Sequence, residues 1–118
     1  MPVQSSSQNT QGWKYLGFNY ASWWNGKFAN AQSTEALAQM SEIGADTSTI
    51  VASSYLDSIY SSEIYSTNNT ESLANVEKAI VDSHNAGLQV WLKPHIDTAG
   101  EWRGKIDPSD RGRFFENY

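Results

Sequence analysis

The chain has 118 residues, a net charge of −5 and no cysteine. This length suits one domain with one core and falls short of the roughly 250 residues of a complete (β/α)8 barrel. The acidic balance, without any basic run, argues against a nucleic-acid partner, and the lack of cysteine excludes disulfides and thiolate metal sites. No window approaches 18 apolar residues, so we expect no membrane span.

The first residues are rich in Ser, Gln and Asn and lack the basic and then apolar pattern of a secretory signal. We interpret residues 1–12 as a flexible leader and residues 13–118 as the domain. The sequence does not predict a cellular compartment.

The rest of the chain alternates between strand-like and helix-like segments. The expected elements are a strand over 13–20, a helix from 33 to Gly44, a strand over 47–53, a helix from Thr70 or Ser72 to Gly87, a strand over 88–95, and a third helix opened by 108–110. The expected buried stripes are Leu37, Met40 and Ile43 on the first helix, and Leu73, Val76 and Ile80 with neighbouring Val81 on the second. Ser33 is the expected N-cap of the first helix. This alternation predicts an α/β fold with parallel strands and right-handed crossovers.

The third strand ends in a cluster of ionisable groups. Lys93, His95 and Asp97 share one parity, so they point to the same side of an extended backbone. They suit hydrogen bonding to a polyhydroxylated ligand, or tuning of a neighbouring carboxylate, at the carboxyl edge of a parallel sheet. The plainer alternative is that His95 and Asp97 cap the loop after Pro94. Two ligands do not make a metal site, and we expect no metal.

The other imidazole, His84, falls in the last turn of the second expected helix. A donor at that position meets the free carbonyls of the helix end, so we interpret His84 as structural.

Two loops carry aromatic and basic residues. Adjacent Trp23 and Trp24 follow the first expected strand and could form a sugar-stacking platform or a hydrophobic lid over the end of the fold. Trp102 and Arg103 follow the third strand, where the guanidinium suits carboxylates or hydroxyl pairs. The alternative for Arg103 is a loop salt bridge, for example to Glu101 or Asp107.

Catalytic carboxylates are not marked by the sequence. Glycoside hydrolysis needs two, roughly 5–10 Å apart. The loop candidates are Asp57, Glu63, Asp97 and Glu101, and no two of them form an evident pair, so we assign no catalytic residue. No Gly-rich phosphate loop follows the first two strands, which ranks a doubly wound nucleotide or flavin binder last and predicts no cofactor.

Five segments together resemble a known family. They are Gly17-Phe18-Asn19-Tyr20-Ala21-Ser22-Trp23, Ile43-Gly44-Ala45, Glu63-Ile64-Tyr65, His84-Asn85-Ala86-Gly87-Leu88, and Leu92-Lys93-Pro94-His95-Ile96-Asp97 with Trp102-Arg103-Gly104 behind it. From Trp13 onward the chain resembles the amino-terminal part of glycoside hydrolase family 113 and related TIM-barrel glycosidases. Lys-Pro-His-x-Asp followed by Trp-Arg-Gly is the most specific part.

The resemblance implies a (β/α)8 barrel that hydrolyses β-linked glycans, typically β-mannan, with retention. It places the acid/base Glu after the fourth strand and the nucleophile Glu after the seventh, and neither has a counterpart here. We therefore expect the first three βα units of an incomplete barrel, inactive alone. The resemblance implies that the loops after these strands line the glycan cleft. The expected substrate-binding residues are Trp23, Trp24, Lys93, His95, Asp97, Trp102 and Arg103.

Two hypotheses of different classes remain at this stage. The first is such a glycoside hydrolase in part, with a β-linked oligo- or polysaccharide as its partner. The alternative is a non-catalytic carbohydrate-binding or assembly module. An open three-stranded sheet leaves its edges unpaired, so we also expect self-association through those edges, or dependence on further strands.

Overall fold

The computed structural model describes residues 12–118, so the expected leader, residues 1–12, lies outside the described residues except for Gly12. The elements are β1 (Gly17–Ser22), a 3-10 turn (Lys27–Ala29), α1 (Ala31–Glu42), β2 (Thr47–Leu56), α2 (Leu73–Asn85), β3 (Gln89–Thr98), a second 3-10 turn (Arg103–Lys105) and α3 (Arg111–Asn117). The predicted alternation of strand and helix is confirmed.

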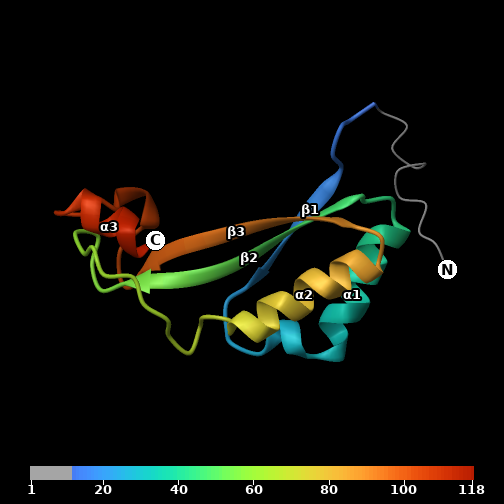
Figure 1. The fold of residues 1–118 in the computed structure, drawn as a ribbon, viewed down its shortest axis with the longest axis horizontal. Helices are drawn as coiled ribbons and strands as arrows, with labels where there is room; N and C mark the ends of the chain where they lie inside the picture. Colours follow the sequence, from blue (N-terminus) through green and yellow to red (C-terminus); the bar gives the residue numbers. More distant parts are fainter. Residues whose placement is uncertain (1–11) are drawn as a thin grey trace.

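The three strands form one parallel sheet in the order β1-β2-β3. α1 and α2 lie side by side against one face of this sheet, while α3 lies beyond the carboxyl ends of β2 and β3 (Figure 1). Parallel neighbours joined by helical crossovers are the βαβ unit that the sequence predicted. The architecture is α/β with an open sheet.

The core lies between the sheet and the two helices. Ile50 of the central strand and Leu37 of α1 are fully buried, and Tyr20 and Val90 from the outer strands pack against the same cluster. Phe28, in the first 3-10 turn, is buried there as well. Burying an aliphatic side chain of this size contributes about 2 kcal/mol, so this layer is the main source of stability.

The helix ends follow local signals, with one correction. Ser72, one of the two predicted starts of α2, caps this helix by accepting a hydrogen bond from Asn75 N, whereas Thr70 lies outside it. α1 is capped by Asn30, whose side chain accepts from Ser33 N, so the prediction that Ser33 is the cap was wrong. Both residue types cap well, and the helix begins one turn earlier than the apolar pattern indicates.

The predicted apolar stripes of the two helices are only partly confirmed. Met40, Val76 and Ile80 pack against the core, but Ile43 is 71% exposed and Leu73 is 89% exposed. Both exposed residues lie at helix ends, Ile43 as the C-cap of α1 and Leu73 as the first residue of α2. A periodic pattern continues past the point where the helix stops facing the sheet, so it overstates burial there.

The strand boundaries also differ from the expected ones. β1 begins at Gly17 rather than at Trp13, and β2 and β3 each run three residues further, to Leu56 and Thr98. A side chain at position 17 would collide with the Thr47 carbonyl, so a glycine is required where the two strands approach. Strand length is set by pairing with the neighbour, which a local pattern does not show.

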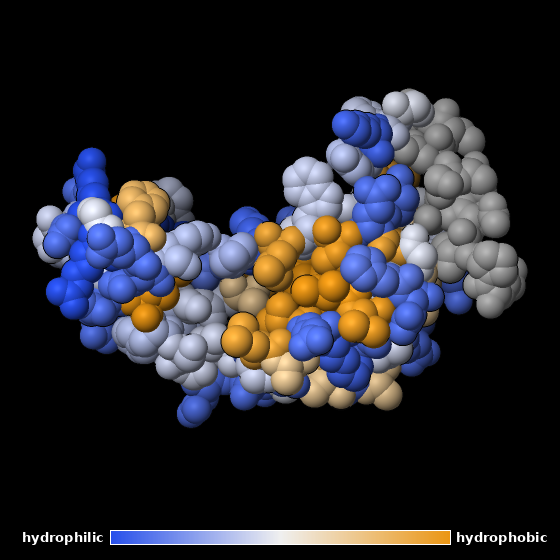
Figure 2. Space-filling model, viewed as in Figure 1, coloured by the Kyte–Doolittle hydropathy of each residue, from blue (hydrophilic) through white to orange (hydrophobic). Residues whose placement is uncertain are grey.

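Part of the surface remains apolar. Figure 2 shows apolar residues gathered over α2 and the neighbouring strand β3, where Leu92 is about half exposed next to Val76 and Leu73. β1 and β3 are the outer strands of the sheet in the described part of the chain. Between residues 12 and 118, no helix has the length and apolar character needed to cross a bilayer.

Candidate functional site

The ionisable cluster of β3 lies on the sheet face opposite the helices. Alternate strand residues point to opposite faces, and Val90 packs into the core. Lys93, His95 and Asp97 therefore lie on the other face, in register with every second residue of β2. The carboxyl ends of parallel strands meet at one edge, where βα folds place their ligands.

Trp23 and His95 are brought together across this edge. Their ring centroids lie 5.9 Å apart at an interplanar angle of 79°, an edge-to-face contact. His95 Nε2 is buried and has no hydrogen-bond partner among the described residues. Burial first, and then the Arg103 and Lys93 cations, lower the pKa of His95, with Asp97 opposing them. His95 is therefore a neutral imidazole at neutral pH. Its Nε2 can accept a hydrogen bond from a hydroxyl or donate one to it.

Asp97 and Arg103 form the second contact of the site. The Arg103 guanidinium lies 3.1 Å from Asp97 Oδ2, with side chains 44% and 25% exposed. The expected loop partners Glu101 and Asp107 were wrong for Arg103. Glu101 pairs with a lysine and Asp107 with a different arginine. An ion pair this exposed keeps access to water, so its donors remain available to a ligand.

The remaining predicted residues lie around this cluster rather than in it. Trp24 is exposed and has the Lys27 ammonium 5.6 Å above its ring. Trp102 is also exposed, and its ring covers Gly104 closely enough to exclude any side chain there. The structure thus joins Trp23 to His95 and Arg103 to Asp97, while Trp24 and Trp102 lie outside these two contacts and remain about half exposed or more.

Each of the four candidate carboxylates has a polar partner among the described residues. Asp97 pairs with Arg103, Glu63 with Arg113 and Glu101 with Lys105, and Asp57 accepts from the Tyr65 hydroxyl at 2.6 Å. Within residues 12–118 no group of three His, Asp or Glu side chains is placed to bind a metal ion.

The sequence reading missed one polar residue, Glu71. Its side chain is only 4% exposed and accepts hydrogen bonds from Ser22, Gly26, Phe28 and Asn75. Burial alone would raise its pKa, but these four donors together lower it below the ordinary value. The local signal, a Glu before a helix start, resembles an ordinary first-turn acid and does not indicate burial.

Known proteins share this fold. The model of Glycoside Hydrolase Family 113 matches residues 16–117. Two solved structures of a GH113 β-1,4-mannanase, one of them a complex, match with TM-scores of 0.78. Their identities are 22% and 23%, and they cover 90% and 88% of this chain. The β-mannanase AaManA from Alicyclobacillus acidocaldarius, in complex with ManMIm, matches with a TM-score of 0.77 and 18% identity over 91% of this chain. No curated protein matches.

These structural likenesses concern the fold. The chain spans 38% of the length of each of the three solved structures, so its three parallel strands match part of a GH113 TIM-barrel enzyme. The family match, by contrast, extends over nearly all of the described residues. The chain belongs to glycoside hydrolase family 113.

Proposed function

We propose that this chain forms one wall of the glycan-binding cleft of a retaining, β-mannanase-like glycoside hydrolase. The observation that carries the proposal is the pairing of Trp23 with His95 beside the Asp97–Arg103 ion pair, at the carboxyl edge of the sheet. A (β/α)8 enzyme builds its active site from the loops at that edge. The solved relatives are β-mannanases, which supports a β-linked mannan as the ligand.

The side chains of this wall suit a polyhydroxylated ligand. The exposed indoles of Trp23, Trp24 and Trp102 offer flat apolar faces on which sugar rings stack. Lys93 and Arg103 carry donors for ring hydroxyls, and the unpartnered nitrogen of His95 can serve one more. The cleft wall is therefore aromatic at its rim and polar at its base.

The same 118 residues are proposed to bind glycan without hydrolysing it. Retaining hydrolysis needs an acid/base and a nucleophile, whereas each of the four candidate carboxylates already has a cation or a hydroxyl as its partner. This observation also favours the alternative, a non-catalytic carbohydrate-binding or assembly module. Product formation separates an enzyme from a binding module, and binding alone does not.

Self-association through the sheet edges is a further part of the proposal. β1 and β3 each have one side without a strand neighbour in the described part of the chain, and Leu92 and Leu73 leave apolar surface beside β3. Unpaired edges and exposed apolar area both promote association. A concentration-independent monomer in analytical ultracentrifugation would contradict this.

The central test is titration of the chain with mannohexaose and cellohexaose, followed by tryptophan fluorescence and by product analysis. We expect a saturable change with mannohexaose and no product. Trp23→Ala should abolish most of this change. Trp91→Ala is the matched control, since that indole is similarly exposed but lies near the opposite end of β3, against Tyr15.

Absence of any glycan response in the folded chain would reject the binding function. Hydrolysis of mannan by the chain would reject its inactivity. Loss of response in Trp91→Ala but not in Trp23→Ala would place the ligand elsewhere than the carboxyl edge.

A further inference from the structure

The loop that carries Trp23 and Trp24 is tied at both ends to one buried carboxylate. Ser22 and Gly26 flank the two tryptophans. The Ser22 hydroxyl lies 2.9 Å from Glu71 Oε1, and Gly26 N lies 2.9 Å from Glu71 Oε2. The segment between them is therefore closed into a short loop whose ends meet at Glu71.

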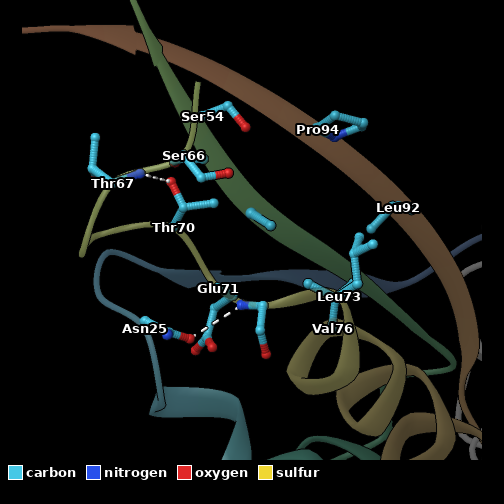
Figure 3. A pocket seen from close by; sticks show the side chains of 13 residues that line it. Asn25, Ser54, Ser66, Thr67, Thr70, Glu71, Leu73, Val76, Leu92 and Pro94 are labelled. Atoms are coloured by element: carbon cyan, nitrogen blue, oxygen red, sulfur yellow. Dashed lines mark hydrogen bonds between the residues drawn. The ribbon is translucent and has the colours of Figure 1, made fainter. Parts of the chain in front are cut away.

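Further hydrogen bonds strengthen this tie. Phe28 N also donates to Glu71 Oε1, at 2.9 Å, which connects the carboxylate to the following 3-10 turn. From the same loop, Asn25 Oδ1 accepts from Ser72 N at 3.1 Å and from Asn75 Nδ2 at 3.2 Å. Figure 3 shows Asn25 and Glu71 side by side between this loop and the start of α2. The loop after β1 is thus docked onto the amino end of α2.

The same network reaches the aromatic residues through the backbone. The Ser22 hydroxyl lies 2.6 Å from the Trp24 carbonyl as well as beside Glu71, so its one proton is shared between two acceptors. Trp23 lies next to this point in the chain and places its indole against His95. Displacing Ser22 from Glu71 would therefore shift both indoles together.

We propose that Glu71 is a positioning residue, which fixes the loop after β1 so that Trp23 meets His95 in the glycan cleft. The inference rests on the proposed function for its ligand but not for its geometry. Glu71 is almost fully buried, and its hydrogen bonds go to Ser22, Gly26, Phe28 and Asn75, so it acts through the loop that carries Trp23 and Trp24 rather than on sugar.

A carboxylate satisfies all four donors at this position. Oε1 receives the Ser22 hydroxyl and Phe28 N–H, and Oε2 receives Gly26 N–H and the Asn75 amide. In Glu71→Gln an NH2 at the Oε2 position would face two groups that only donate. At the Oε1 position it would still face Phe28 N–H, although it could donate to the Ser22 hydroxyl, whose proton can turn to the Trp24 carbonyl. The substitution keeps the shape of the side chain but loses at least one of the four hydrogen bonds.

The experiment compares the wild-type 118-residue chain, Glu71→Gln and Glu77→Gln. Glu77 is exposed on α2, which begins two residues after Glu71, so its substitution controls for the lost charge. The two readouts are mannohexaose affinity by fluorescence, and the NMR cross-peak between the Trp23 indole and the His95 ring. Both are measured at a temperature where far-UV circular dichroism shows the chains folded.

We expect Glu71→Gln to weaken mannohexaose binding by about tenfold or more and to lose the Trp23–His95 cross-peak. Glu77→Gln should keep both. A folded Glu71→Gln chain that retains the cross-peak and the wild-type affinity would overturn the inference while leaving the proposed function intact.

The opposite failure is distinguishable. If the wild-type chain binds no glycan but Glu71→Gln still loses the cross-peak, the proposed function fails and the positioning of Trp23 by Glu71 stands. If Glu71→Gln does not fold, Ser22→Ala replaces it, since this variant removes one loop bond and leaves the carboxylate. A folded Ser22→Ala chain with an unchanged cross-peak would then overturn the inference.

Discussion

Two polar clusters at the strand ends are held in opposite ways. Glu71 is 4% exposed and accepts four hydrogen bonds, three of them from one loop. Asp97 and Arg103 form a single ion pair with substantial access to water. A buried carboxylate with several donors fixes a backbone conformation, because breaking it leaves those donors unpaired. An exposed pair costs little to break, so it can exchange partners with a ligand.

This difference separates positioning from recognition within one small domain. The Glu71 cluster orders the loop after β1, and the Asp97–Arg103 cluster offers its donors at the end of β3. The two meet where Trp23 contacts His95. Variants at Glu71 should therefore change stability strongly, and variants at Arg103 should change it little.

The largest expected effect is that of Glu71→Ala on stability. The truncation leaves the part-buried Gly26 N–H and the buried Phe28 N–H without an acceptor, so we expect a loss of about 3 kcal/mol in the free energy of unfolding. Urea denaturation followed by far-UV circular dichroism measures it. Glu77→Ala, on the exposed side of α2, should change stability by less than about 0.5 kcal/mol. Equal effects of the two variants would contradict the comparison.

Lowering the pH should remove the stabilisation that the Glu71 carboxylate gives to the wild-type chain. The folded-state pKa of Glu71 is lowered from its ordinary value of 4.5, so its contribution is complete above pH 4.5 and is lost as the pH falls through the lowered value. We expect the stability difference between wild type and Glu71→Gln to be constant from pH 7 to pH 5 and to shrink below pH 4.5. Urea midpoints of both chains at each pH measure it. A difference that stays constant down to the pH at which the wild-type chain unfolds in acid would show that the carboxylate charge does not matter.

The sequence correctly predicted the features that depend on local signals. Gly44 and Gly87 end the helices, with φ angles of 104° and 84°, and Ser72 caps α2 as predicted. The parity of Lys93 and His95 along β3 also follows from strand geometry alone. Such features need only the residues on either side of them.

The features that were missed depend on partners far away in the chain. Glu71 lies 43 to 49 residues from the three loop donors that explain its burial, so no local window connects them. The exposure of Leu73 has a similar origin, because it depends on where α2 meets the sheet rather than on helical spacing. Asp97 was not among the example partners expected for Arg103. The sequence pattern placed residues 96–98 in a loop, whereas the structure has them in β3.

Arg103→Ala should affect stability less than the Glu71 variants do. It also tests whether the exposed Asp97–Arg103 pair is coupled to His95. The ion pair with Asp97 is partly exposed, so the free energy of unfolding should fall by at most about 1 kcal/mol. The variant should nevertheless raise the pKa of His95, because the Arg103 cation lowers it and the freed Asp97 carboxylate raises it. An NMR titration of the His95 ring protons measures the shift.

Lys105→Ala is the control, since that cation pairs with Glu101 rather than with Asp97. If both variants leave the His95 titration unchanged, the strand end is not electrostatically coupled and the cluster offers a ligand only separate donors. If Arg103→Ala alone shifts it, the imidazole and the ion pair act as one site.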